Sequence, residues 1–479
     1  MSENLVYSFK IKILDLKNRR IEMEEENKFR LSSDVLLSKN KEEIAYRIIG
    51  GQAVIIHLKR NTFNVLNTLA TQIWQLIDGQ TLIEQIIESV YREFKVERPV
   101  LNQDCFGFLR EMLKKGLLKT AFPVKVISDQ KQLAETKGEL FDTLREKAIT
   151  GQIPLIAHFD LTYKCNLDCV HCYIVDKNRS VLGAKEIKDI LDQLAKAGTL
   201  YLTLSGGEVL TRKDFLEIAR YARKLHFALR ILTNGTLMDE TTADEIASLN
   251  PEMVAISIYS TKPEIHDKIT KAPGSFQKSI SAAEMLRDRD VRLKISTVIM
   301  KENMGDYRDV YELSRQLKAA FQADYRITPK TDGNKSPLAV HVDEKYLPEL
   351  LADPIFTEKS EPEPQEVYSG IFNTIPCGAG HMSCYITPYG DVYPCVQLPI
   401  NCGNLKEVSF TEIWNNSPEL SKFRSIKISD ITSCFQCEFF RYCRICVGLN
   451  FVEESSMFSP SKRACREARI MKELGRERR

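Results

Sequence analysis

Three cysteines within a short loop are the group in this sequence best suited to redox chemistry. They stand in the stretch Cys165-Asn-Leu-Asp-Cys169-Val-His-Cys172, a C-x3-C-x2-C spacing. Three thiolates on one loop can ligate three irons of a [4Fe–4S] cubane and leave the fourth iron open to another ligand. A zinc site is the competing interpretation, but it needs four ligands and the sequence offers no fourth one nearby.

The elements expected around these cysteines place them at the end of a strand. β-like and helical segments alternate over residues 153–350, as they do in an α/β barrel. Strands are expected at residues 156–162, 201–205, 228–233, 253–259, 292–299 and 324–328, with helices such as 184–197 and 212–225 between them. Barrel enzymes carry their chemistry on the loops that follow the strands, and the cysteine loop directly follows the first one.

A cysteine loop after the first strand, with Gly206-Gly207-Glu208 after the second, resembles the radical S-adenosylmethionine (SAM) superfamily. The resemblance implies an α/β fold with a partial (β/α)6 TIM-like barrel. It also implies that the cluster cleaves SAM reductively, and that the resulting 5′-deoxyadenosyl radical abstracts a hydrogen from a substrate. It assigns iron ligation and catalysis to the three cysteines, and contact with the SAM amino group to the Gly-Gly-Glu segment.

Further SAM contacts are expected at the ends of later strands. Asn234 stands at such an end, although the Asn-Gly pair that it begins is also an ordinary turn. Ser257 occupies the place of a ribose contact in the family, where Tyr-Ser now replaces the usual Asp-Gly two residues later. Arg326 is expected to reach the SAM carboxylate, and a structural salt bridge is the alternative.

A second set of cysteines crowds the region 376–479. The set consists of Cys377, Cys384, Cys395, Cys434, Cys437, Cys443, Cys446 and Cys465. A zinc ribbon would explain part of this spacing. The whole pattern resembles the SPASM extension of radical SAM maturases, which holds two auxiliary [4Fe–4S] clusters, although the last gap of the dense motif is two residues here and three is usual.

That resemblance implies three [4Fe–4S] clusters in all. It assigns Cys377, Cys384, Cys395 and Cys446 to auxiliary cluster I. It assigns Cys434, Cys437, Cys443 and Cys465 to auxiliary cluster II. Two cysteines remain: Cys105 lies on an apolar helix and is expected to be a small buried hydrophobe, while Cys402 is a structural residue, a ligand or a reactive thiol.

The region 1–125 is expected to form a winged-helix-like domain. Short strands are expected at residues 35–37, 45–49 and 53–58, and helices at 67–77, 82–94 and 100–115. The run that begins at Tyr46 and the helix after Asn64 resemble the PqqD-like recognition element, which binds the leader of a ribosomally made peptide as an added strand. A DNA-binding winged helix is weakened because the third helix carries Glu111 and few basic residues.

Composition and segment order set the remaining limits. Lys and Arg total 67 against 65 Asp and Glu, so a net charge of +2 gives no general attraction to nucleic acid or to an anionic membrane. The sequence shows neither a run of roughly 18 apolar residues nor a signal peptide, which favours a cytoplasmic protein whose 13 cysteines bind metal rather than form disulfides. Residues 126–152 are expected to connect the first domain to the barrel, and 351–375 to link the barrel to the SPASM domain.

The leading hypothesis is an enzyme that matures a ribosomally synthesised peptide by forming a thioether or carbon–carbon crosslink. Its expected partners are a precursor peptide, whose leader binds the N-terminal domain, and a flavodoxin-like or ferredoxin-like reductant. One alternative keeps the chemistry but modifies an enzyme residue, as in sulfatase or quinone-cofactor maturation, or a tetrapyrrole. Another is a non-catalytic iron–sulfur redox sensor or peptide chaperone.

Overall fold

The computed structural model describes residues 31–94, 97–120, 137–177, 179–330, 333–356, 375–443 and 445–475. They belong to two compact units, Met1–Lys39 with Gln75–Ile127 and Asn40–Trp74 with Ser128–Arg479. The division cuts through the N-terminal domain expected at 1–125, because residues 40–74 associate with the barrel. Most of the expected linker 351–375, and residues 126–136 of the expected connector, lie outside the described residues.

The first unit contains a short antiparallel strand pair and two helices. Its strands are β1 (Leu37–Lys39) and β5 (Leu118–Thr120), and its helices are α2 (Ile83–Glu93) and α3 (Arg98–Lys114). The apolar residues of α2 recur every three or four positions and are buried, which is the pattern of an amphipathic helix. Cys105 is fully buried on α3, as the sequence predicted.

A small antiparallel sheet opens the second unit. Its strands β2 (Ile44–Ile49), β3 (Gln52–His57) and β4 (Thr62–Val65) are followed by α1 (Thr68–Leu76). The β2–β3 turn is Gly50-Gly51, and both residues have the positive φ that a tight hairpin requires. Arg47 fixes the sheet to the barrel, because its guanidinium donates to the backbone oxygens of Thr199 and Leu225, both at 2.7 Å.

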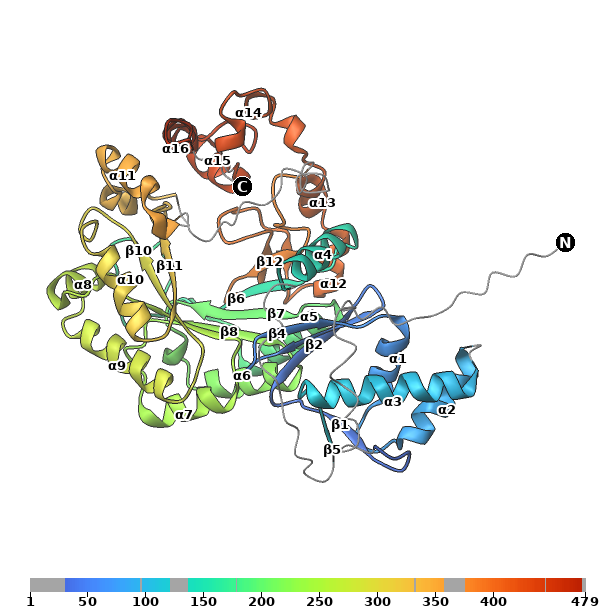
Figure 1. Ribbon diagram of the computed structural model, residues 1–479. Coiled ribbons are helices and arrows are strands. Elements are labelled where there is room, and N and C mark those ends of the chain that lie inside the picture. The colour runs from blue at the N-terminus through green and yellow to red at the C-terminus, as the bar shows by residue number, and fades with distance from the viewer. Residues whose placement is uncertain are drawn as a thin grey trace. The chain divides into compact units, whose positions relative to one another are not determined.

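The barrel is built on six parallel strands, which Figure 1 shows running side by side. They are β6 (Ile156–Thr162), β7 (Tyr201–Gly206), β8 (Ala228–Thr233), β9 (Met253–Ser257), β10 (Leu293–Val298) and β11 (Ala320–Asp324). The sequence placed the last strand at 324–328, which is wrong. Ala320–Asp324 pairs in register with Lys294–Val298, so backbone pairing fixes the strand four residues earlier.

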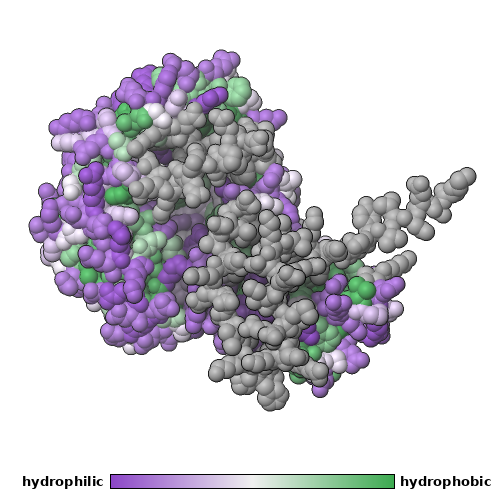
Figure 2. Space-filling view, in the orientation of Figure 1, coloured by the Kyte–Doolittle hydropathy of each residue, from purple (hydrophilic) through white to green (hydrophobic). Residues whose placement is uncertain are grey.

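Helices cover one face of this sheet. They are α5 (Ala184–Lys196), α6 (Phe215–Lys224), α7 (Glu240–Ser248), α8 (Pro263–Thr270), α9 (Ser275–Asp288) and α10 (Tyr307–Gln316), and α4 (Lys137–Thr150) precedes β6. Alternate strand residues such as Phe159, Leu204 and Ile231 pack under them in the main core. On the face in view in Figure 2, hydrophilic residues predominate over α7 to α10. The strand residues between these apolar ones point into the bore of the barrel.

The cysteine-rich region continues the barrel sheet. Its strand β12 (Ser383–Ile386) pairs in parallel with β6, and β13 (Asp391–Tyr393) and β14 (Gly403–Asn404) extend the sheet antiparallel. The helices that accompany it are α11 (Leu347–Ala352), α12 (Phe410–Asn416), α13 (Pro418–Arg424), α14 (Thr432–Phe435), α15 (Val447–Glu454) and α16 (Lys462–Glu473). The expected α/β barrel is confirmed, whereas the extension of its sheet by the next region was not predicted.

Candidate active site

The cysteine loop leaves β6 and is held by the end of α8. Backbone N–H groups of Asp168 and Val170 donate to the carbonyl oxygens of Thr270 and Ile269, at 3.2 and 3.0 Å. Burial, together with the neighbouring thiols of Cys172 and Cys165, raises the pKa of the Cys169 thiol to about 12. The three sulfurs are therefore near neighbours in an apolar surrounding, where a metal cation is the natural counterion for their thiolates.

The two glycines of the Gly-Gly-Glu segment let it press against the backbone of this loop. Gly207 N–H donates to the Thr162 oxygen at 2.7 Å, and Glu208 N–H donates to the Lys164 oxygen at 3.0 Å. A Cβ added to Gly206 would lie 2.0 Å from the Thr162 oxygen, and Gly206 also has a φ of +137°. No other residue fits there without displacing the strand end, so the segment aligns the loop as well as any ligand beside it.

Glu208 is a buried structural carboxylate. Its side chain accepts hydrogen bonds from Thr233 Oγ1 and from the Asn234 and Leu210 N–H groups, at 2.7, 2.7 and 3.0 Å. Burial raises the pKa of its carboxyl group, and these three donors oppose the shift. The carboxylate thus joins the ends of β7 and β8, and its direct contact with the SAM amino group stays a prediction.

Asn234 contacts the cysteine loop itself. Its side-chain NH2 donates to Asn166 Oδ1 at 3.0 Å and lies 3.9 Å from Cys165 Sγ, while its side-chain oxygen accepts from the Thr236 N–H at 2.9 Å. This is more than an ordinary Asn-Gly turn, because the amide is oriented by its own loop toward a cluster ligand. Asn166, inside the cysteine motif, is a partner that the sequence did not single out.

Tyr259 touches the other side of the cysteine loop. Burial raises the pKa of the Tyr259 hydroxyl well above its usual value, and the nearby Cys169 thiol raises it further. The ring is held edge-on by His171, with ring centres 4.9 Å apart. The Tyr-Ser that replaces the family's Asp-Gly therefore places a buried aromatic ring beside the cysteine loop, and the ribose contact of Ser257 stays a prediction.

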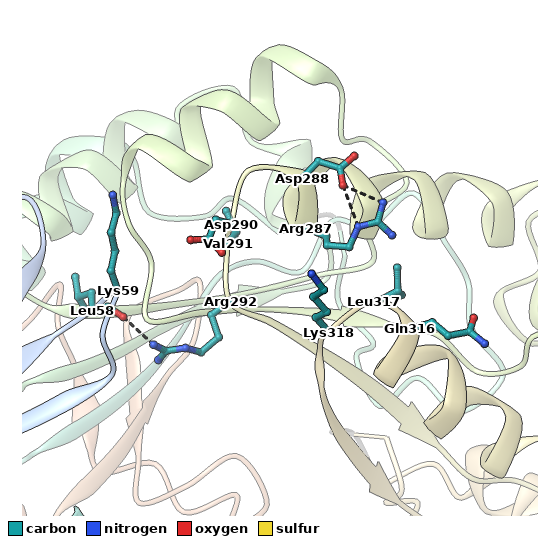
Figure 3. A pocket seen from close by; sticks show the side chains of 10 residues that line it. All are labelled: Leu58, Lys59, Arg287, Asp288, Asp290, Val291, Arg292, Gln316, Leu317 and Lys318. Carbon is teal, nitrogen blue, oxygen red and sulfur yellow. Dashed lines mark hydrogen bonds and ion pairs between the residues drawn. The ribbon is translucent and has the colours of Figure 1, made fainter. Parts of the chain in front are cut away.

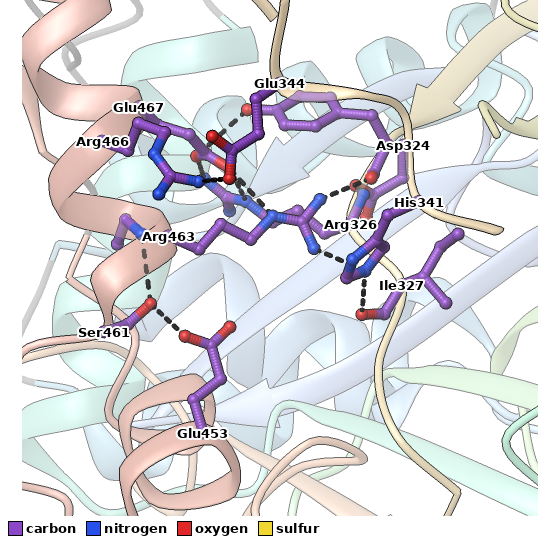
Figure 4. Close-up of polar contacts among 12 residues, drawn as sticks. Asp324, Arg326, Ile327, His341, Glu344, Glu453, Ser461, Arg463, Arg466 and Glu467 are labelled. Atoms are coloured by element: carbon purple, nitrogen blue, oxygen red, sulfur yellow. Dashed lines mark hydrogen bonds and ion pairs between the residues drawn. The ribbon is translucent and has the colours of Figure 1, made fainter. Parts of the chain in front are cut away.

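Arg326 is engaged in an ion pair. Its guanidinium donates to Glu467 on α16 at 2.6 Å, and Glu467 is fully buried (Figure 4). Arg463, which flanks the same carboxylate, also bonds His341 at 2.9 Å. The expected contact between Arg326 and the SAM carboxylate is replaced by its alternative, a structural salt bridge, because the Arg326 guanidinium is already paired with the buried carboxylate of Glu467.

The cysteines assigned to cluster II lie together. Burial raises the pKa of the Cys434 thiol, and the nearby thiols of Cys465 and Cys437 raise it further. The Cys443 sulfur lies 4.0 Å from the carbonyl oxygen of Ala464, the residue before Cys465. Cys434, Cys437 and Cys465 are thus neighbours and Cys443 lies beside the residue before Cys465, while ligation of one cluster by all four stays a prediction.

The structure brings together only three of the four cysteines assigned to cluster I. Burial raises the pKa of the Cys377 thiol to about 11, and the thiols of Cys395 and Cys446 raise it further. Cys384 points into the main core from β12, where burial raises its pKa to about 12 and Cys402 is a neighbouring thiol. Cys384 is therefore corrected from a ligand to a core residue, because strand alternation turns it toward the helices.

Family models match three consecutive parts of the chain. The radical SAM superfamily model matches residues 160–314, the iron–sulfur cluster-binding SPASM model 377–438, and the model of coenzyme PQQ synthesis protein D (PqqD) 52–118. This chain is a radical SAM enzyme. Its cofactors are SAM and [4Fe–4S] clusters.

Relatives of this radical SAM enzyme carry several activities. It is 29% identical to the AdoMet-dependent heme synthase of Methanosarcina barkeri, over 62% of this chain and 92% of the relative. It is 26% identical to AlbA of Bacillus subtilis, a biosynthesis protein of the antilisterial bacteriocin subtilosin, over 80% of this chain and 85% of the relative. SuiB of Streptococcus suis, solved with precursor peptide SuiA, shares the fold with a TM-score of 0.58 and 18% identity over 90% of this chain and all of SuiB.

A cavity of about 580 Å³ lies at the end of the barrel strands opposite the cysteine loop (Figure 3). Its basic residues include Arg287, Arg292 and Lys318, and it lies where α9 and α10 end. Cations at helix C-termini stabilise the helix dipole, which accounts for them without a ligand. Among the described residues, no helix is long and apolar enough to cross a membrane.

Proposed function

We propose that this enzyme matures a ribosomally synthesised precursor peptide by closing a thioether or carbon–carbon crosslink. The observation that carries the proposal is the union in one chain of a radical SAM barrel, an iron–sulfur SPASM region and a PqqD domain. AlbA and SuiB, named for a bacteriocin and a precursor peptide, support this substrate class. A heme-synthase activity is the second candidate, favoured by the relative at 29% identity, but that match covers only 62% of the chain.

The chemistry divides between the cofactor and the chain. When bound, the [4Fe–4S] cluster supplies an electron to SAM and an open iron for its amino and carboxylate groups. Cys165, Cys169 and Cys172 hold it, and the side-chain NH2 of Asn234 lies 3.9 Å from the sulfur of Cys165. Cluster I receives three cysteines, which leaves one of its irons available to a further ligand. We propose a flavodoxin-like or ferredoxin-like protein as the reductant.

The leader is proposed to add a strand to β4. Leu66 N–H donates to the Ala53 oxygen at 2.9 Å, so by alternation the N–H groups of Phe63 and Val65 point away from β3. In the sheet that the structure describes, β4 is at the edge. An extended peptide would gain main-chain hydrogen bonds there.

The substitution Val65→Pro tests the leader site, with Val65→Ala as its matched control. Proline removes one outward N–H from an edge strand and keeps the bonds to β3, whereas alanine keeps the N–H. We expect the proline variant to bind the leader about fivefold more weakly than the alanine variant, the loss of one strand hydrogen bond at about 1 kcal/mol. Equal leader affinities of the two variants by fluorescence anisotropy would contradict this site.

Product mass tests the activity. The enzyme is reconstituted anaerobically with SAM, a reductant and a candidate short precursor peptide sought among the neighbouring genes. Each crosslink should lower the precursor mass by two hydrogens, with SAM consumed as a co-substrate. The variant with Ala at Cys165, Cys169 and Cys172 should lose about four of roughly twelve irons and form no 5′-deoxyadenosine. A gain of a methyl group, an unchanged mass with deuterium uptake, or turnover of a tetrapyrrole in place of the peptide would contradict the proposal.

A further inference from the structure

A buried polar relay crosses the inner face of the barrel at β6. His158 Nε2 lies 3.0 Å from Asp160 Oδ1, and Tyr385 donates its hydroxyl to Asp160 Oδ2 at 2.8 Å. The Tyr163 hydroxyl lies 2.6 Å from that of Tyr385. Asp160 is completely buried, so both of its oxygens are satisfied by side chains rather than by water. None of these residues has a role in holding the clusters or SAM in the site described above.

The direction of each hydrogen bond follows from the carboxylate. An ionised Asp160 only accepts, so His158 must donate through Nε2–H and Tyr385 through its hydroxyl proton. The Tyr163 hydroxyl then donates to the Tyr385 oxygen. A neutral His158 with its proton on Nε2 keeps a lone pair on Nδ1. The carboxylate beside it would stabilise the imidazolium that forms when Nδ1 takes up a proton.

His158 is the accessible end of this relay. On β6 the residues Ala157, Phe159 and Leu161 lie in the core under the helices, so His158 and Asp160 point the other way, into the bore. The His158 side chain is 29% exposed, whereas Asp160 is 0% exposed. The relay thus presents one imidazole to the interior in which a barrel enzyme binds the reacting part of its substrate.

We propose that His158 is the base that accepts the proton released when the crosslink closes, and that Asp160 and Tyr385 position it. This inference rests on the function proposed above. A substrate C–H bond breaks and its hydrogen atom goes to the 5′-deoxyadenosyl radical. The substrate carbon then bonds to the nucleophile, a thiol or an aromatic ring, which loses its own S–H or C–H bond. One electron passes to an auxiliary [4Fe–4S] cluster and one proton passes to His158.

This assignment explains why the relay is made of these residue types. Closing the bond releases a proton, and general base catalysis is worth about 10²–10⁴-fold in rate. Glu252, a carboxylate at the start of β9, is not the base, because Arg230 at 2.7 Å and Arg292 at 3.8 Å already hold it in ion pairs. Tyr385 stands opposite His158 in the β6–β12 register, so the cysteine-rich region supplies the residue that fixes Asp160.

The test is His158→Ala, assayed for crosslinked peptide formed per 5′-deoxyadenosine and for free peptide mass. We expect the ratio of product to 5′-deoxyadenosine to fall at least tenfold, imidazole in the buffer to restore part of it, and a substrate radical to accumulate in freeze-quench electron paramagnetic resonance spectra. Tyr385→Phe should lower the ratio less, because it removes only one hydrogen bond to Asp160. Iron content, cluster spectra and leader affinity should match the wild type in both variants.

Tyr393→Phe is the matched control, since it removes a tyrosine hydroxyl from the neighbouring strand outside the relay and should keep the wild-type ratio. A His158→Ala ratio equal to that of the wild type would overturn the inference and leave the proposed function intact. A fall with normal spectra but without imidazole rescue or radical accumulation would also overturn it, because this outcome marks a structural role. If the wild-type enzyme forms no product two hydrogens lighter, both the function and the inference fail.

Discussion

Replacement of Gly207 by alanine tests how the Gly-Gly-Glu segment positions the cysteine loop. The added Cβ would lie 2.5 Å from the Lys164 oxygen and 2.6 Å from the Tyr163 oxygen, and both are backbone atoms that cannot rotate away. An ordinary contact needs about 3.4 Å, so the segment and the loop must separate by nearly 1 Å. Gly305→Ala is the matched control, because a Cβ there meets nothing within 4 Å and neither glycine has a positive φ.

The expected cost follows from the two backbone hydrogen bonds that this separation breaks. They run from Gly207 to Thr162 and from Glu208 to Lys164, at 2.7 and 3.0 Å. At about 1 kcal/mol each the loss is about 2 kcal/mol, which corresponds to roughly a thirtyfold fall in the population of the aligned loop.

The assay is SAM affinity of the reconstituted enzyme, measured from the change that SAM causes in the spectrum of the reduced cluster. Gly207→Ala should bind SAM about thirtyfold more weakly, and Gly305→Ala should bind it normally. Both variants should retain the irons of the auxiliary clusters, because the substitution is remote from their cysteines. Equal SAM affinities in the two variants would refute the close-approach argument.

Three further predictions concern the other contacts. Cys384→Ser should keep all of roughly twelve irons whereas Cys377→Ser loses about four, and an equal loss would restore Cys384 as a ligand. Glu467→Gln should lower the free energy of unfolding by about 3 kcal/mol in denaturant titrations, because two arginines lose their buried partner. It should leave the affinity for SAM unchanged. A weakened SAM affinity at normal stability would mean that Arg326 belongs to the SAM site. Asn234→Ala should lower the midpoint potential of the SAM-binding cluster by roughly 40 mV, the equivalent of one hydrogen bond of about 1 kcal/mol, and an unchanged potential would contradict the contact with Cys165.

The sequence predicted the parts of this site that depend on local spacing. Cysteines a few residues apart share a loop, and a run that alternates in polarity, such as Ile156–Thr162, forms a strand, so both were located to the residue. Contacts between distant segments carry no such signal. Arg326 and Glu467 are 141 positions apart, and Asp160 and Tyr385 are 225 apart, so which partner each chooses is decided by the packing of whole elements.

The error at Cys384 has the same origin. Counting cysteines makes it the fourth ligand of cluster I, because it falls between Cys377 and Cys395 in a region dense in ligands. The pairing of β12 with β6 excludes Cys384 as a cluster ligand, because this register places Cys384 and Tyr385 on opposite faces of the sheet. A one-residue shift of this register would exchange the two, and only the neighbouring strand can fix it.

The regions on either side of the barrel are not modules that can be removed without disturbing it. At the cysteine-rich end, β12 covers the edge of β6, and Tyr385 completes the shell of Asp160 within the bore. At the other end, Arg223 of α6 donates to the backbone of Ile44 in β2, so the sheet of residues 40–74 is part of the barrel's own packing. Deleting residues 1–125 would therefore remove contacts of the catalytic unit together with any leader site. Point changes such as Val65→Pro separate peptide binding from chemistry where truncation does not, because they leave both of these junctions in place.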